Sequence, residues 1–278
     1  MRVDGSTALY GIIGNPVAHS FSPAMQTAAL QAVGINAVYL PFLAQPGRLQ
    51  PLLTAFAEIG LQGFNVTVPF KEEILPLLDQ VSPFAQRLGS VNTVVREGAQ
   101  WIGHSTDGPG FVAGLQAIGF DFAQKRICLL GAGGSAKALA WAMAEAGIAS
   151  LTILNRTPKK SLALGQELRK AGLGVQMGFN GYRLDEEFDL LVNSTSLGMQ
   201  GGCPAEDDLI ARSKQVVDII YNPPETELLA KAKAMGKPTS NGLSMLLYQG
   251  VRAFEIWTKQ AAPVTIMQAC LISNLQTL

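Results

Sequence analysis

The fold is decided by residues 126–147, RICLLGAGGSAKALAWAMAEAG. This stretch joins an apolar run typical of a buried strand to an alanine-rich helix through a glycine-rich turn. The turn has the G-x-G-x-x-A spacing of a dinucleotide-binding motif, and the start of the helix offers free N–H groups and a positive dipole end to an anion. The sequence therefore predicts a phosphate-binding turn formed by Gly131, Ala132, Gly133, Gly134, Ser135 and Ala136.

The end of the next apolar run predicts which dinucleotide binds. An NAD site would place a carboxylate about 20 residues after the turn, where it accepts from the ribose 2′-hydroxyl. The chain has Asn155, Arg156 and Thr157 there, with Lys159 and Lys160 close behind. A guanidinium, a hydroxyl and two ammonium groups suit a 2′-phosphate, so NADP is predicted over NAD. Both lysines and Arg156 also fit ordinary solvated surface positions.

Short β-like runs alternate with longer helical segments on both sides of this stretch, which is typical of α/β units. The upstream series has β-like runs at 10–14, 37–43 and 64–68, helical segments at 24–33 and 49–59, and a hairpin of 90–96 with 101–104. The downstream series has β-like runs at 126–130, 151–154, 189–195 and 215–221, with helical segments at 135–146, 158–171 and 243–258. We expect an α/β fold in two lobes.

Composition excludes several classes of protein. Lys plus Arg and Asp plus Glu both number 21, which argues against nucleic acid or an anionic membrane as the main partner. Hydrophobic residues make up 48% and charged residues 15%, as in a folded chain. Two histidines and no CxxC pair offer no metal cage, and the scattered cysteines imply no disulfide framework. Cys128, within the first apolar run of residues 126–147, is expected to be buried and inert.

No secretory signal is recognisable in the first 16 residues, MRVDGSTALYGIIGNP, because glycine and proline interrupt any apolar region. The longest apolar stretch, residues 138–154, contains Glu145 and Gly147, so no membrane span is predicted. We expect a cytoplasmic protein.

Polar clusters follow the strands of the first half. They are HSFSP (19–23), NVTVPFK (65–71), GSVNT (89–93) and GHSTD (103–107). Strand ends in open α/β sheets form the ligand crevice, so these clusters predict a binding site. Taken singly, Ser22 also reads as a helix N-cap, Lys71 as a surface residue and Asp107 as the cap of a helix beginning near Pro109.

The order of the motifs resembles the shikimate dehydrogenase family. The chain reads GNPVAHSFSP, NVTVPFK, GSVNT, STDGPG, GAGGSAKA, NRT, NSTSLGM, DIIYNPPET and GLSMLLYQG between residue 11 and about residue 250. The resemblance implies a substrate-binding domain at 1–107 completed by 243–278, with a Rossmann-like NADP-binding domain at 108–242. It also implies the reversible NADPH-dependent reduction of 3-dehydroshikimate to shikimate, in aromatic amino-acid biosynthesis.

The same resemblance implies roles for individual residues. Ser20, Ser22 and Tyr221 match residues at the substrate carboxylate, while Thr67, Asn92 and Gln249 match residues that bind the ring hydroxyls. Lys71 and Asp107 match the catalytic pair. Residues at the cofactor are Gly131 to Ala136, Asn155, Arg156, Thr157, Lys159, Met199 and Gly242. Ser105 departs from the asparagine usual in the family's G-x-N-T-D motif, which affects the expected geometry of that loop.

The reaction needs a side-chain acid or base, because the alcohol proton leaves as hydride leaves carbon and no metal site is apparent. We expect Lys71 to act as the acid or base and Asp107 to orient it, although the two should titrate as a coupled unit. Two alternatives remain. One is a quinate/shikimate dehydrogenase that uses NAD or both cofactors, and the other is a non-catalytic dinucleotide-sensing protein. The partners expected are a small-molecule substrate and, at most, a second copy of the chain, as a monomer or homodimer.

Overall fold

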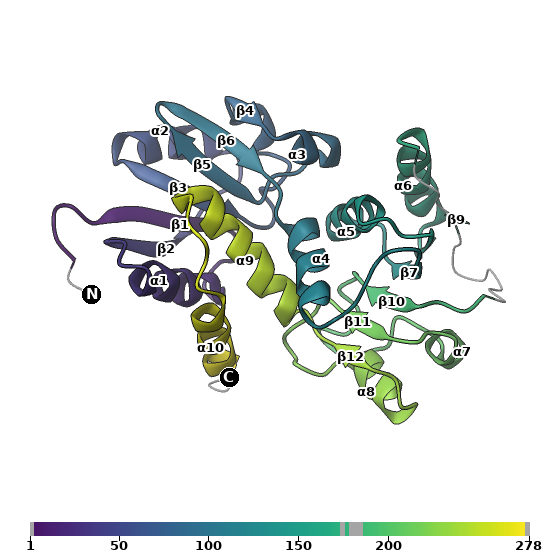
Figure 1. The fold of residues 1–278 in the computed structure, drawn as a ribbon. Coiled ribbons are helices and arrows are strands. Elements are labelled where there is room, and N and C mark those ends of the chain that lie inside the picture. Colours follow the sequence, from purple (N-terminus) through teal and green to yellow (C-terminus); the bar gives the residue numbers. More distant parts are fainter. Residues whose placement is uncertain (1–2, 173–175, 178–185, 276–278) are drawn as a thin grey trace. The chain divides into compact units, whose positions relative to one another are not determined.

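The computed structural model describes residues 3–172, 176–177 and 186–275 and divides the chain into two compact units (Figure 1). The first unit consists of the chain up to Thr106 and from Leu247 onward, and the second is Asp107–Leu246. The second unit is thus inserted into the first in sequence. Each unit has its own sheet, which confirms the predicted α/β class with two lobes.

The sheet of the first unit is mixed. Its strand order is β2-β1-β3-β5-β6-β4. β1 is parallel to β2 and β3, whereas β5 is antiparallel to both β3 and β6 and forms the predicted hairpin with β6. The bounds are β1 Ala8–Gly14, β2 Ala37–Leu43, β3 Leu61–Val66, β4 Gln80–Val81, β5 Thr93–Glu97 and β6 Gln100–His104.

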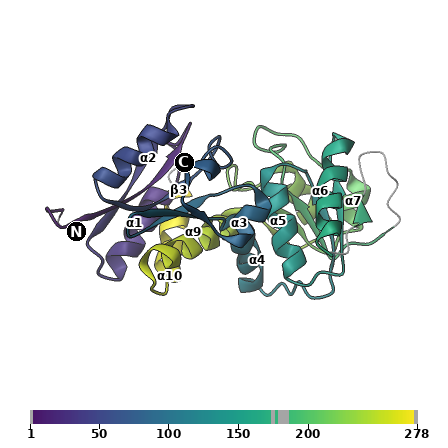
Figure 2. The same ribbon diagram turned by 90° about the horizontal axis from the view of Figure 1, so that it is seen from above.

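Helices cover both faces of this sheet. Figure 2 shows α1, α9 and α10 on one side and α2 on the other. The bounds are α1 Ser22–Ala32, α2 Leu49–Glu58, α3 Pro83–Leu88, α9 Leu243–Thr258 and α10 Val264–Leu275, with a 3₁₀ turn at Leu75–Leu77. On the α2 side, the ring of Phe64 lies 5.4 Å from Phe56 and 5.5 Å from Trp101, within the core of the unit.

The C-terminal helices complete the first unit. Trp257 of α9 donates its indole N–H to the Val94 carbonyl at 2.9 Å, and its ring lies where a Cβ on Gly63 would be only 2.5 Å away. Gln26 of α1 donates to the Gly250 carbonyl at 2.9 Å. The core between α1, β3 and β5 is therefore closed by residues from the far end of the chain.

The reading of Ser22 as a helix N-cap is wrong. Phe21 occupies the N-cap position without a side-chain cap, and Ser22 is the first residue of α1. The Ser22 side chain is buried, and its backbone N–H donates to the Ser20 hydroxyl at 3.3 Å. The Ser22 side chain therefore does not cap the start of α1.

The sheet of the second unit is parallel, in the order β12-β11-β10-β7-β8-β9. Helices α5 and α6 lie on one face, with α7 and α8 on the other (Figure 1). The strands are β7 Arg126–Leu130, β8 Ser150–Leu154, β9 Gln176–Met177, β10 Leu190–Asn193, β11 Val216–Asp218 and β12 Thr239–Ser240. The helices are α4 Asp107–Ala117, α5 Gly134–Glu145, α6 Pro158–Lys170, α7 Asp207–Ala211 and α8 Glu227–Ala234.

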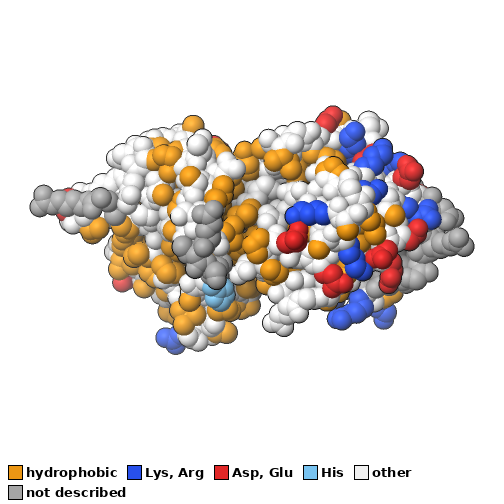
Figure 3. Space-filling model, turned by 90° about the horizontal axis from the view of Figure 1, so that it is seen from below, with side chains coloured by type: hydrophobic (Ala, Val, Ile, Leu, Met, Phe, Trp, Pro, Cys, Tyr) orange, Lys and Arg blue, Asp and Glu red, His pale blue; other side chains and the backbone are white. Residues whose placement is uncertain are grey.

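Cys128 is fully buried in β7, as expected, and burial raises the pKa of its thiol far above the usual range. Among the residues described, no helix has the length and apolar character needed to cross a membrane. On the face drawn in Figure 3, most charged side chains gather on the right-hand half, where both signs are intermixed.

Candidate cofactor and substrate sites

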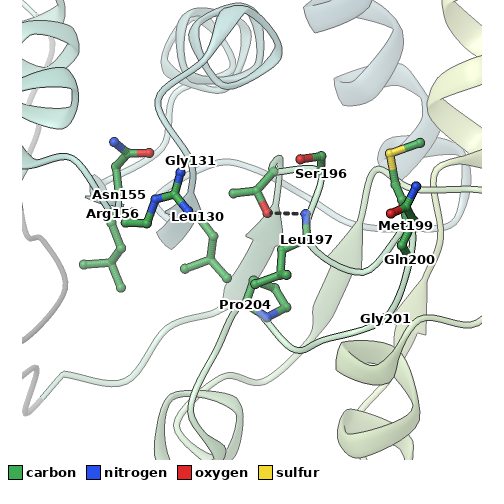
Figure 4. A pocket seen from close by; sticks show the side chains of 12 residues that line it. Leu130, Gly131, Asn155, Arg156, Ser196, Leu197, Met199, Gln200, Gly201 and Pro204 are labelled. Atoms are coloured by element: carbon green, nitrogen blue, oxygen red, sulfur yellow. Dashed lines mark hydrogen bonds between the residues drawn. The ribbon is translucent and has the colours of Figure 1, made fainter.

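A pocket of about 630 Å³ lies at the carboxyl ends of the strands in the second unit (Figure 4). This volume suits a small-molecule ligand. Because all strands of this sheet run parallel, the ends of β7 and β8 and the segment after β10 meet at one edge. The lining residues are Leu130, Gly131, Leu154, Asn155, Arg156, Thr195, Ser196, Leu197, Met199, Gln200, Gly201 and Pro204.

The glycine-rich turn begins the pocket. Gly131 has φ +110°, and a Cβ there would lie 2.7 Å from the Ser194 hydroxyl oxygen, so this position requires glycine. A Cβ on Gly133 or Gly134 would meet nothing within 4 Å, which leaves the backbone open to a close ligand. Gly133 is the N-cap of α5, and the first N–H groups of a helix have no intrahelical partner. The turn therefore has the form that a pyrophosphate needs.

Asn155 and Arg156 lie at one end of the pocket, where β8 ends. In the view of Figure 4 the Arg156 guanidinium is turned toward the Gly131 turn. Asn155 donates its side-chain amide to the Thr157 carbonyl at 2.8 Å, which stabilises the bend before α6. Thr157 is the N-cap of α6 and makes no side-chain capping bond. Lys159 and Lys160 are exposed in the first turn of that helix, so this end of the pocket has a cationic side chain in its lining and two more nearby.

Met199 and Gln200 form the other end of the pocket (Figure 4). They occupy the tip of a tight reversal between Gly198 and Gly201, whose φ angles are +116° and +92°. The Gly198 N–H donates to the Gly201 carbonyl at 3.2 Å, and Met199 is 56% exposed. An exposed methionine at this tip can lie flat against an aromatic ring of a ligand.

The sequence analysis predicted four lining residues of this pocket, namely Gly131, Asn155, Arg156 and Met199. Eight lining residues were not predicted: Leu130 and Leu154 are the last residues of β7 and β8, and Thr195, Ser196, Leu197, Gln200, Gly201 and Pro204 lie after β10. A signal for them was available, since they lie at or after the ends of apolar runs of a parallel sheet.

A buried polar network lies at one edge of the first sheet. Asn92 donates its amide to the Thr106 hydroxyl at 3.0 Å and accepts from the Thr106 N–H at 2.7 Å. Asn65 donates to the Asn92 carbonyl and to the Thr93 hydroxyl, each at 3.0 Å. Tyr39 donates to the Asn65 side-chain oxygen at 2.7 Å, and burial raises the pKa of Tyr39 well above its usual range. The network is therefore built of neutral groups that hold Asn92 in one orientation.

The turn after β3 is fixed to the same edge. The Thr67 N–H donates to the Ile13 carbonyl at 2.9 Å, and the Lys71 carbonyl accepts from Val91 at 2.8 Å. A Cβ on Gly14 would lie 2.4 Å from a methyl carbon of Thr67, so the ends of β1 and β3 approach closely. Thr67, Lys71 and Asn92 thus come from one region of the first unit, with Lys71 half-buried.

Asp107 does not precede a helix that begins near Pro109, because α4 begins at Asp107 itself. Its carboxylate lies in the first turn of α4, where the helix dipole favours a negative charge. Asp107 directly follows Thr106, the residue held by Asn92.

The remaining predicted residues have mixed surroundings. Gln249 is buried in α9, while Tyr221 follows β11 and burial raises the pKa of its hydroxyl. A Cβ on Gly242 would lie 1.9 Å from the Ile219 carbonyl oxygen, so packing alone demands glycine there. The described residues hold no group of three His, Cys, Asp or Glu side chains that could bind a metal.

Three family models match the chain. They are the shikimate dehydrogenase substrate-binding domain over residues 12–94, shikimate/quinate 5-dehydrogenase over 114–198, and the shikimate 5′-dehydrogenase C-terminal domain over 242–269. A shikimate dehydrogenase (NADP+) of Moorella thermoacetica is 45% identical over 98% of this chain and 95% of its own length. One of Geobacter sulfurreducens is 42% identical over the full length of both chains.

Solved structures agree with these matches. A shikimate dehydrogenase in complex with NADP+ superposes with a TM-score of 0.92 at 35% identity, covering 99% of this chain and 98% of its own. A quinate dehydrogenase of Corynebacterium glutamicum, in complex with NAD, has a TM-score of 0.88 at 32% identity, with 96% and 99% covered. The chain belongs to the shikimate/quinate dehydrogenase family.

Proposed function

We propose that this chain is an NADP-dependent shikimate dehydrogenase, which reduces 3-dehydroshikimate to shikimate reversibly. The observation that carries the proposal is the pocket of the second unit, whose lining has Arg156 and no carboxylate at the end of β8. The curated relatives named above carry the same activity and cofactor in their names. We further propose that it acts in the cytoplasm, as a monomer or homodimer.

NADP fits the residues of the pocket. The open backbone at Gly133 and Gly134 accommodates the pyrophosphate, with Ala132, Ser135 and Ala136 completing the turn. Arg156, with Thr157 and Lys159, would hold the 2′-phosphate, because a guanidinium can donate two parallel hydrogen bonds to it. Met199 would flank the nicotinamide, and Gly242 would support the wall beside it. When bound, the cofactor supplies or accepts the hydride, and the protein supplies orientation.

The substrate would be held mainly by hydroxyl and amide groups. In our proposal Ser20, Ser22 and Tyr221 bind the carboxylate, and Thr67, Asn92 and Gln249 bind the ring hydroxyls. The neutral network behind Asn92 supports this role, since it fixes which way the Asn92 amide points. Neutral donors and acceptors of fixed orientation discriminate between hydroxyl patterns, because a mismatched substrate leaves one of them unpaired.

Lys71 would transfer the proton, and Asp107 would orient it. In reduction, a protonated Lys71 polarises the C3 carbonyl and donates its proton to the oxygen as hydride arrives at carbon. In oxidation the same amine accepts the hydroxyl proton. The pair shares one proton-transfer task, so it is best described as a coupled unit.

A steady-state assay of shikimate and quinate, each with NADP and NAD, tests the proposal. The expected result is a kcat/KM for shikimate with NADP that exceeds each of the other three combinations at least tenfold. Higher activity with quinate and NAD would contradict the proposal and favour the function named for the Corynebacterium relative. Turnover with none of the four, together with NADP binding, would favour a dinucleotide-sensing protein.

A further inference from the structure

A buried pair of side chains lies beneath the segment that lines the middle of the cofactor pocket. Asn193 and Asp218 are the last residues of β10 and β11, stand opposite each other in the sheet register, and have no exposed surface. The Asn193 amide donates to the Asp218 carboxylate at 3.1 Å. Neither residue was assigned a role above, and neither lines the pocket.

Asn193 uses its whole hydrogen-bonding capacity on the lining segment and on Asp218. Its side-chain oxygen accepts from the Thr195 N–H at 3.0 Å and from the Thr195 hydroxyl at 2.8 Å. Its second amide hydrogen goes to the Leu197 carbonyl at 3.1 Å. The Leu197 N–H returns to the Thr195 hydroxyl at 3.2 Å, the bond drawn in Figure 4. Thr195 and Leu197 are thus both hydrogen-bonded to the side-chain amide of Asn193, which fixes the path of residues 194–197.

Asp218 joins this amide to two further segments. One carboxylate oxygen also accepts from the Ile220 N–H at 3.0 Å, and the other accepts from the Thr226 hydroxyl at 2.8 Å. Thr226 is the N-cap of α8, and a Cβ on Gly198 would lie 3.4 Å from its Cβ. The carboxylate therefore ties together β10, the chain after β11, and the start of α8.

Stability of the fold does not explain why a carboxylate is buried here. Burial raises the pKa of the Asp218 carboxyl, and the hydrogen bonds from Ile220, Asn193 and Thr226 only partly oppose that effect. All three of these donors are neutral. A buried carboxylate that accepts only from neutral donors is a poor way to stabilise a fold, because apolar residues of similar size do so at lower cost. Its use is better explained by the geometry that it imposes.

We infer that Asn193 and Asp218 are a buried positioning pair that holds residues 194–197 in the shape that NADP binding requires. This inference rests on the proposed function. Neither residue touches the ligand in this view; they act through Thr195 and Leu197, which line the pocket. Asn193 should therefore govern affinity for the cofactor and leave affinity for shikimate unchanged.

A charge-swap cycle tests the pair. Asn193→Asp sets a second carboxylate against Asp218 and removes the donor to Leu197, so the Kd for NADP, measured by calorimetry, should rise at least about tenfold. The double variant Asn193→Asp with Asp218→Asn again joins one amide to one carboxylate. It should recover much of the lost affinity, a non-additivity that distant, independent residues do not show. The KM for shikimate should stay within about twofold in Asn193→Asp.

Asp189→Asn is the matched control, because Asp189 lies directly before the other end of β10 and is bonded to Arg126 and Lys214 there. It should lower the melting temperature without changing the Kd for NADP. The inference is overturned if Asn193→Asp lowers the melting temperature but binds NADP as the wild type does, or if the double variant binds no better. Should Asn193→Asp not fold, Asn193→Ser replaces it. A Kd for NADP equal to that of the wild type in Asn193→Ser would also overturn the inference. A wild-type chain that does not bind NADP contradicts the proposed function instead.

Discussion

The two units build their candidate sites from different chemical groups. In the first, a buried network of neutral side chains, such as the Tyr39–Asn65–Asn92 chain of hydrogen bonds, lies at the sheet edge, with the half-buried Lys71 in the turn after β3. In the second, the pocket combines open backbone at a glycine turn with an exposed guanidinium. Neutral groups of fixed direction suit a small polyhydroxy ring, and cations with open N–H groups suit phosphates.

The difference divides the kinetic consequences of substitution. Changes in the first unit, and at Asp107 where the second unit begins, should alter kcat or the response to shikimate, whereas changes in the lining of the second unit's pocket should alter the response to the cofactor. The following substitutions test that division, in order of decreasing expected effect.

Lys71→Ala should have the largest effect. Loss of the proton-transferring amine should lower kcat by about 10²–10⁴-fold, with the KM values for shikimate and NADP within several-fold of normal. The exposed neighbour Glu72 provides the control, since Glu72→Ala should retain normal kcat. A kcat for Lys71→Ala within threefold of wild type would mean that Lys71 does not transfer the proton.

Asp107→Ala should also abolish most turnover while the chain stays folded. A residue that only stabilised the start of α4 would cost about 1 kcal/mol of stability and leave the rate unchanged. The melting temperature and kcat, measured on one preparation, separate the two roles. Normal turnover with a lower melting temperature would remove Asp107 from the catalytic pair.

Arg156→Asp should act on the cofactor alone. The loss of a charge-assisted hydrogen bond costs about 1.5–3 kcal/mol, or roughly 10–150-fold in affinity for NADP, before repulsion is added. NAD should be affected much less, because its bare 2′-hydroxyl can donate to the new carboxylate. The measurement is the KM of each cofactor at saturating shikimate and two salt concentrations. An unchanged NADP/NAD preference would assign the phosphate to other residues.

Gly242→Ala should destabilise the second unit. The new methyl group would meet the Ile219 carbonyl oxygen, and overpacking of this kind typically costs about 1–3 kcal/mol. Thermal unfolding of the variant, measured without NADP, should occur at a lower temperature than that of the wild type. Gly236→Ala is a useful comparison, since nothing lies within 4 Å of a Cβ there and its strain comes from φ +72° alone.

Asp189→Asn should have the smallest effect, and one that depends on pH. Burial alone would raise the pKa of Asp189, but bonds from the Arg126 N–H and Lys214 hold it below its ordinary 3.8. A carboxyl with a lowered pKa stabilises the fold above its ordinary pKa and loses this contribution as pH falls through the lowered value. Melting at neutral pH should therefore show a loss of up to about 1 kcal/mol, which begins to shrink as pH falls below 3.8 and disappears once pH is below the lowered pKa of Asp189.

How much the sequence predicted differs between the two sites. The glycine turn, Arg156 and Met199 lie in local patterns, namely a strand, a turn and the start of a helix, that are recognisable within a few residues. Tyr39, Asn65 and Thr93 are polar residues inside apolar strands, and no local pattern distinguishes them. Asn65 meets Thr93 only because β3 and β5 pair antiparallel in that register, and sequence spacing does not determine register.

Several elements of the fold have no recognisable sequence pattern. β4, β9 and β12 have two residues each, too few for an alternating pattern. The chain of α10, VTIMQACLISNL, mixes β-branched and helix-forming residues, so its periodicity is ambiguous. β10 and β11 are shorter than the apolar runs that predicted them, because Asn193 and Asp218 turn the chain out of the sheet.

The insertion of 140 residues between Thr106 and Leu247 also determines the order in which the two units can be completed during synthesis. Trp257 and α10 close the core of the first unit, yet a ribosome adding about 5–20 residues per second needs roughly 7–28 s to pass from the end of β6 to α9. Throughout that interval the nascent first unit exposes the apolar surfaces around Gly63 and α1 that these helices later cover. The second unit is contiguous and can finish folding first. The earliest part of the chain to be made is thus the last to be completed, and it is the part that most needs protection from aggregation in the cell.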